Sequence, residues 1–196
     1  MNTLKEIEGR EDRVVNICPD GSEGLIVEVG DLSIQLPKAP AKNKILFHNL
    51  KKEEQYWRRQ ELPSDLAIIS SMDEWSQTPD EFRKKYQSYI KTEYERRRNG
   101  VWFYNNGEPT YITGHHYFFL QWSKIDVGYP SFLRFQQELF IHMEACFRDP
   151  RCLGQVYTKC RRSGYTQMSS SLLSGEATQV KDKLLGIMSK TGSDAQ

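Results

Sequence analysis

Apolar and polar residues alternate along the first part of the chain. Residues 32–36 (LSIQL) have the period of two expected of a half-buried strand, and residues 25–29 (LIVEV) form a second apolar run. A Gly-Asp pair separates the two runs, as in a tight hairpin turn. A shorter run at residues 14–17 (VVNI) is followed by a turn sequence. We therefore expect residues 1–40 to form a β region.

The spacing of the apolar residues becomes helical in residues 41–100. Residues 50–61 are predicted to form a helix that ends before Pro63. Thr78 and Pro79 give a strong start signal for a longer helix, with Thr78 as its cap and Pro79 in its first helical position. Large apolar residues follow at helical spacing: Phe82, Tyr86, Tyr89, Ile90 and Tyr94.

After Gly100, which is expected to end that helix, a hairpin and two further helices are predicted. Residues 101–112 read as two short strands joined by an Asn-Gly turn. An aromatic helix (HHYFFLQW) follows Thr113 and Gly114. Residues 133–148 have an apolar stripe of helical period, and the Asp-Pro pair after them stops this second helix.

The segments after residue 150 suggest a parallel sheet. Residues 153–158 (LGQVYT) are predicted to form a strand, and residues 159–164 a polar loop that ends in glycine. A helix is expected to start near Thr166, and residues 183–188 (KLLGIM) read as a buried second strand. Strands that alternate with helices in this way favour parallel pairing.

The predicted fold class is α/β. It consists of a partial P-loop NTPase domain with a parallel sheet, preceded by an α+β N-terminal region that contains β-hairpins. We expect three parts: a β region in residues 1–40, a helical region in residues 41–100, and the start of the P-loop domain, with its aromatic lead-in, in residues 101–196.

Composition narrows the function classes only slightly. The net charge of +1 over 196 residues gives no overall basic field for nucleic acid, so such binding would need local patches. No apolar run approaches the roughly 20 residues that span a bilayer, and the charged N-terminus lacks a signal-peptide core. None of the four cysteines forms a C-x-x-C pair. A cytosolic location is therefore expected.

Residues 159–166 (KCRRSGYT) partly match the phosphate-binding pattern G-x-x-x-x-G-K-[ST]. Gly164 and Thr166 fit the last glycine and the hydroxyl that would hold Mg²⁺, whereas Lys159 stands at the first glycine and Tyr165 at the lysine. A phosphate cradle needs backbone N–H groups at a helix N-terminus and at least one cation.

The missing lysine has possible substitutes within the same loop. Lys159 could reach across it, and Arg161 and Arg162 could bind phosphate with two hydrogen bonds each. The alternative interpretation is an ordinary strand–turn–helix that carries basic residues on its surface.

One helix upstream, Phe135 and Gln136 form a candidate adenine site. A glutamine amide offers one donor and one acceptor to the N6/N7 edge of adenine, and the neighbouring aromatic ring can stack on the base. Gln137 is the fallback for the same role. The alternative is an ordinary helix start with two surface glutamines.

Together these features resemble the N-terminal ATPase of the large terminase subunits of tailed phages, which are DNA-packaging motors. The resemblance rests on the aromatic-Gln element, the helix and strand after it, and the loop KCRRSGYT, whose lysine comes first and whose end is Gly-Tyr-Thr. The segment YITGHHYFFLQW is similar to the aromatic lead-in of such ATPases. The resemblance covers roughly residues 100–196.

The resemblance implies ATP and Mg²⁺ as cofactors. It implies that Lys159 acts as the P-loop lysine, that Thr166 holds Mg²⁺, and that Gln136 reads adenine. It gives Arg162 the catalytic role of a contact to the γ-phosphate. The other expected nucleotide-binding residues are Phe135, Arg161, Ser163, Gly164 and Tyr165.

The implied work is translocation of double-stranded DNA into a procapsid, with a portal protein, a small terminase subunit and a homo-oligomeric ring as partners and no membrane. Such an ATPase also needs an apolar strand ending in Asp-Glu, which the sequence lacks. We therefore expect an N-terminal piece of a longer protein that binds nucleotide weakly and turns it over poorly. The alternatives are a helicase-like translocase fragment and a noncatalytic virion or assembly protein.

The adjacent histidines His115 and His116 are interpreted structurally. No third ligand stands at a suitable spacing for a metal site, so they are expected to serve the start of the aromatic helix.

Overall fold

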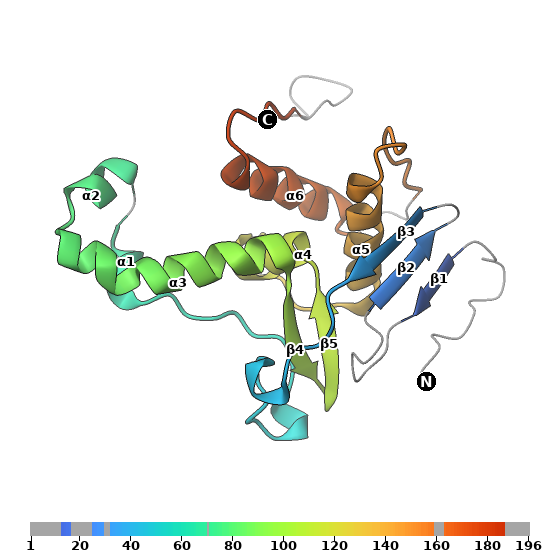
Figure 1. Ribbon diagram of the computed structural model, residues 1–196, viewed down its shortest axis with the longest axis horizontal. Helices are drawn as coiled ribbons and strands as arrows, with labels where there is room; N and C mark the ends of the chain where they lie inside the picture. Colours follow the sequence, from blue (N-terminus) through green and yellow to red (C-terminus); the bar gives the residue numbers. More distant parts are fainter. Residues whose placement is uncertain (1–12, 17–24, 30–31, 70, 159–162, 187–196) are drawn as a thin grey trace.

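The computed structural model describes residues 13–16, 25–29, 32–69, 71–158 and 163–186 of the chain. Within them, helices are combined with two small antiparallel sheets (Figure 1). The hydrophobic core is rich in aromatic side chains. Strands β1 (Arg13–Asn16), β2 (Leu25–Val29) and β3 (Leu32–Leu36) form an antiparallel sheet in sequence order. This confirms the strands that the alternation predicts in the N-terminal part of the chain.

Residues 50–61 do not form the predicted helix. The chain has two short 3₁₀ turns, η1 (Lys42–Lys44) and η2 (Lys52–Glu54), and runs irregularly after the second. The reason is that tertiary contacts hold its backbone. Gln60 donates its backbone N–H to the side chain of Gln121 at 2.9 Å, and its carbonyl oxygen accepts from the same amide at 2.7 Å. Trp57, which lies in the same irregular stretch, is part of the core.

Two short helices, α1 (Ser64–Ala67) and α2 (Met72–Gln77), lead to the long helix α3 (Asp80–Asn99). The predicted start of α3 is displaced by one residue: Pro79 is the cap and Asp80 the first helical residue. Thr78 instead ends α2, where its hydroxyl donates to the carbonyl oxygen of Trp75 at 2.7 Å.

The predicted hairpin is confirmed as β4 (Val101–Asn105) paired antiparallel with β5 (Glu108–Ile112). Gly100 ends α3 as expected, with a φ of 75° and a ψ of −175°, a backbone conformation that glycine adopts readily. Asn106 and Gly107 also have positive φ values, of 51° and 87°, as a two-residue type I′ turn requires.

The centre of the molecule is helix α4 (Gly114–Trp122), which packs against α3, α5 (Arg134–Arg148) and α6 (Tyr165–Gln179) (Figure 1). The predicted start of this helix is confirmed, and Thr113 is its cap: the Thr113 side chain accepts a hydrogen bond from the backbone N–H of His116. The largest fully buried side chains of the core include Phe103, Tyr111, Ile112, Tyr117, Leu120, Phe140, Ile141 and Met168.

A buried carboxylate joins α3 to α4. Glu93 accepts hydrogen bonds from the hydroxyl of Tyr117 at 2.6 Å and from the indole N–H of Trp122, and Arg97 pairs with it at 3.2 Å. The guanidinium of Arg97 also lies 4.5 Å from the ring centre of Trp122. The charge of Glu93 is therefore compensated by a cation and by two further donors.

The predicted parallel sheet is wrong for the residues that the structure describes. Residues 153–158 form no strand, and Leu153 and Val156 are both 100% exposed. Residues 183–186 form no strand either, and Leu184 is 96% exposed, while the rest of that predicted strand lies outside the described residues. A strand needs a neighbour for its backbone hydrogen bonds, and neither segment has one here.

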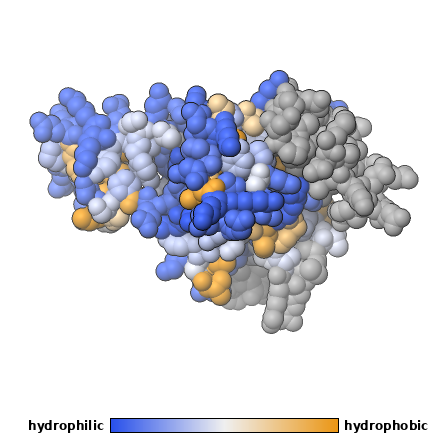
Figure 2. All heavy atoms as spheres, turned by 90° about the horizontal axis from the view of Figure 1, so that it is seen from below, coloured by the Kyte–Doolittle hydropathy of each residue, from blue (hydrophilic) through white to orange (hydrophobic). Residues whose placement is uncertain are grey.

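The end of the molecule that carries α1 and α2 is predominantly hydrophilic when seen from below, with small scattered hydrophobic areas (Figure 2). Among the described helices, none has the length and apolar character needed to cross a membrane.

Candidate functional site

Helix α6 begins directly after the predicted phosphate loop. Gly164 is its cap, in the left-handed conformation with φ 75° and ψ 4°, and its carbonyl oxygen accepts the first helical hydrogen bond, from Met168. Thr166 lies in the first turn with its side chain exposed. As at any helix N-terminus, the N–H groups of this first turn have no partner within the helix, and groups of this kind can bind an anion. A side-chain carbon at Gly164 would meet no atom of the described residues within 4 Å.

The basic residues of the loop, Lys159, Arg161 and Arg162, lie outside the described residues. The two flanks of the loop are described, and they meet: the rings of Tyr157 and Tyr165 stack with their centres 4.5 Å apart and their planes 9° apart. The residues that flank the loop on its two sides are therefore in contact.

Tyr165 occupies the position of the usual P-loop lysine, and in the structure its side chain has a packing role. Its ring is partly buried against the hydrophobic core and stacks on Tyr157. It therefore anchors the first residue of α6. Beside it, the hydroxyl oxygen of Ser163 is enclosed and has no hydrogen-bond partner among the described residues.

The two glutamines of the candidate adenine site are both buried. Gln136 is only 6% exposed, and its side-chain oxygen has no partner among the described residues. Gln137 donates to the carbonyl oxygen of Tyr111 at 2.5 Å, which fixes α5 to β5. Phe135 is 48% exposed and so remains accessible for stacking. A base would reach Gln136 only after its covering side chains had moved.

A cluster that spacing did not reveal lies where α4, α5 and α6 meet. His115 contacts Glu144 through Nδ1 at 3.3 Å and Glu176 through Nε2 at 2.6 Å. Ionised carboxylate oxygens only accept hydrogen bonds, so both contacts are made at once when both ring nitrogens carry a proton, and the arrangement favours the charged imidazole. Burial opposes this charge, but the two carboxylates outweigh it and raise the pKa of His115. Lys183 also pairs with Glu176, which holds the chain after α6 against this junction.

His116 has the opposite environment. It is fully buried and stacks between the rings of Phe132 and Phe140, with ring centres 5.7 Å and 4.7 Å away. Neither ring nitrogen has a hydrogen-bond partner among the described residues, and burial lowers its pKa to about 3. No group of three or more potential metal ligands occurs in the described part of the chain.

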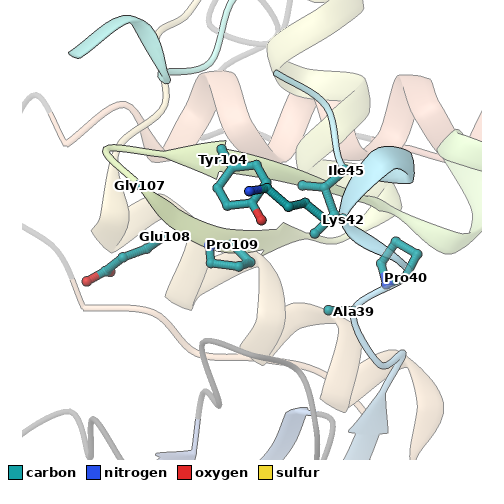
Figure 3. A pocket seen from close by; sticks show the side chains of 8 residues that line it. All are labelled: Ala39, Pro40, Lys42, Ile45, Tyr104, Gly107, Glu108 and Pro109. Carbon is teal, nitrogen blue, oxygen red and sulfur yellow. The ribbon is translucent and has the colours of Figure 1, made fainter. Parts of the chain in front are cut away.

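An open groove of about 430 Å³ lies elsewhere, between the linker after β3 and the β4–β5 hairpin (Figure 3). It combines apolar surface with one cation, Lys42, and one carboxylate, Glu108. The remaining lining residues are Ala39, Pro40, Ile45, Tyr104, Gly107 and Pro109. None of them belongs to the predicted nucleotide site.

Comparison with known proteins does not identify the chain: no family model, no curated protein and no solved structure matches it.

Proposed function

We propose that this chain carries the nucleotide-binding loop of a viral DNA-packaging ATPase of the large-terminase type, with ATP and Mg²⁺ as its cofactors. The observation that supports this most is the junction at Gly164. The sequence KCRRSGYT leads into a helix whose first-turn N–H groups have no partner within the helix, and the side chain of Thr166 is exposed there. The stack of Tyr157 on Tyr165 supports it further, because a phosphate cradle requires a loop whose ends are close together.

The residues fit the cofactors in the following way. Thr166 would hold Mg²⁺ through its hydroxyl, and the first N–H groups of α6, with the hydroxyl of Ser163, would donate to phosphate oxygens. Lys159, Arg161 and Arg162 would supply the positive charge that phosphates require, with Arg162 nearest to the γ-phosphate. Phe135 would stack on adenine, while Gln136 would pair with its edge once uncovered.

The larger assembly is part of the same proposal. It would comprise a homo-oligomeric ring that moves double-stranded DNA through a portal protein, with a small terminase subunit as a further partner. A second candidate is a noncatalytic virion or assembly protein. The exposed apolar segment 153–158 favours it, because fully exposed Leu153 and Val156 are suited to contact with another protein. Nucleotide binding distinguishes the two candidates.

The test is a titration with a fluorescent ATP analogue, with and without Mg²⁺. We expect binding to depend on Mg²⁺ and to weaken roughly 10- to 100-fold in Lys159→Ala, which removes a charge-assisted hydrogen bond to phosphate. Lys181→Ala is the matched control, because Lys181 is a highly exposed lysine beyond α6. Equal affinities of the two variants would exclude the lysine role, and no binding at millimolar nucleotide would favour the assembly protein.

A further inference from the structure

A tight turn follows α5 directly, and two cysteines stand on either side of it, six residues apart in the sequence. Cys146 is buried in the last turn of α5. Past the end of the helix, the backbone N–H of Cys152 donates to the carbonyl oxygen of Asp149 at 3.0 Å, which closes a tight turn. Arg151 holds this turn, because its guanidinium and its backbone N–H both donate to the carboxylate of Asp149.

The two thiols have different environments. The Sγ of Cys146 lies 3.8 Å from Nε2 of His142, one helical turn earlier. The thiol of Cys152 is half-buried and donates to the carbonyl oxygen of Gly154 at 3.4 Å. Burial raises the pKa of the Cys146 thiol, and the adjacent Cys152 thiol raises it further, whereas Gln155 lowers it. Cys152 is thus the accessible thiol and Cys146 the protected one, with an imidazole beside it.

We propose that Cys146 and Cys152 form a redox-active dithiol that a small-molecule disulfide oxidises to an intramolecular disulfide. The thiolate of Cys152 attacks the reagent RSSR, which forms a mixed disulfide and releases RS⁻. Cys146 then transfers its proton to Nε2 of His142 and attacks the Sγ of Cys152, which releases the second RS⁻. The two cysteines lose two electrons and two protons in total, and the reagent leaves as two RSH molecules.

The disulfide would close a short ring, residues 146–152, between the end of α5 and the segment that leads to the loop at residues 159–164. It would therefore fix the start of this segment against α5 without touching the loop itself. The inference does not rest on nucleotide binding, because it depends only on the turn and on the two thiols.

The sequence allows a direct test on the unmodified protein. All four cysteines fall in different tryptic peptides, and cleavage after Arg148 and Arg151 separates Cys146 from Cys152. The folded protein is treated with oxidised glutathione, the remaining thiols are alkylated, and the digest is analysed without reduction. The expected product is FQQELFIHMEACFR joined to CLGQVYTK through one disulfide. The same treatment in denaturant is the control for pairing that does not need the fold.

The two steps can also be separated. In Cys152→Ser, we expect Cys146 to react with oxidised glutathione roughly tenfold more slowly than Cys152 does in the natural chain, since burial disfavours its thiolate. In His142→Asn, the mixed disulfide at Cys152 should accumulate before the intramolecular disulfide forms. The proposal is overturned if the linked peptide is absent from the folded protein, if the mixed disulfide persists as the final product, or if Cys152 pairs with another cysteine.

Discussion

Lowering the pH from 7 to 5 should destabilise the protein through His116. In the unfolded chain this imidazole has its ordinary pKa of 6.5, whereas burial between Phe132 and Phe140 lowers its pKa in the folded protein to about 3. Between these values the unfolded state binds one more proton than the folded state, so stability is complete above pH 6.5 and is lost as the pH falls. At 1.36 kcal/mol for each unit, the loss by pH 5 is about 2 kcal/mol.

The variant His116→Phe isolates this contribution. Phenylalanine keeps an aromatic ring in the stack and removes two ring nitrogens that have no partner among the described residues, so it should fold with equal or greater stability at pH 7. Urea unfolding followed by tryptophan fluorescence gives the free energy of unfolding at each pH. The stability difference between variant and natural chain should widen by about 2 kcal/mol from pH 7 to pH 5.

The contributions of the other titrating groups to the pH dependence cancel in this comparison, because both proteins contain these groups. His115 is the important one, since its raised pKa gives a stabilisation that is complete below pH 6.5 and lost as the pH rises. An identical pH dependence in the natural chain and in His116→Phe would refute the argument. It would mean that His116 meets a proton acceptor or water in the folded protein.

Two further substitutions test the packing around α4. Glu93→Ala should lower the free energy of unfolding by about 2–4 kcal/mol, because it leaves Tyr117, Trp122 and Arg97 without their acceptor. Glu95→Ala, on the exposed side of α3, is the control and should change this free energy little. Equal effects of the two variants in urea unfolding would contradict the prediction. Gly114→Ala should lower the free energy of unfolding by about 2–3 kcal/mol, because the added carbon would lie 2.0 Å from the carbonyl oxygen of Arg97. The carbon added in Gly154→Ala meets no atom of the described residues within 4 Å, so this variant should be tolerated in the same assay.

The features predicted correctly from the sequence are those with local signals. The Asn-Gly turn of the β4–β5 hairpin, the start of α4 at Thr113 and Gly114, and the end of α3 at Gly100 each depend on a few neighbouring residues, and the structure confirms all three. The helix predicted at residues 50–61 failed because its backbone is held by Gln121, which is 61 residues away in the sequence. The cluster around His115 could not be predicted for the same reason, since its partners Glu144 and Glu176 stand 29 and 61 residues away in the sequence.

The candidate nucleotide loop lies between these two cases. Gly164 and the helix after it follow from local signals, whereas a strand at residues 153–158 depends on a neighbour that the described residues do not provide. A phosphate loop positions its N–H groups best when an anchored strand enters it, and here the described restraint on its two ends is the stack of Tyr157 on Tyr165. Pairing of residues 153–158 with another strand and binding of phosphate by the loop would therefore favour the same conformation. By linkage, each of the two events should strengthen the other.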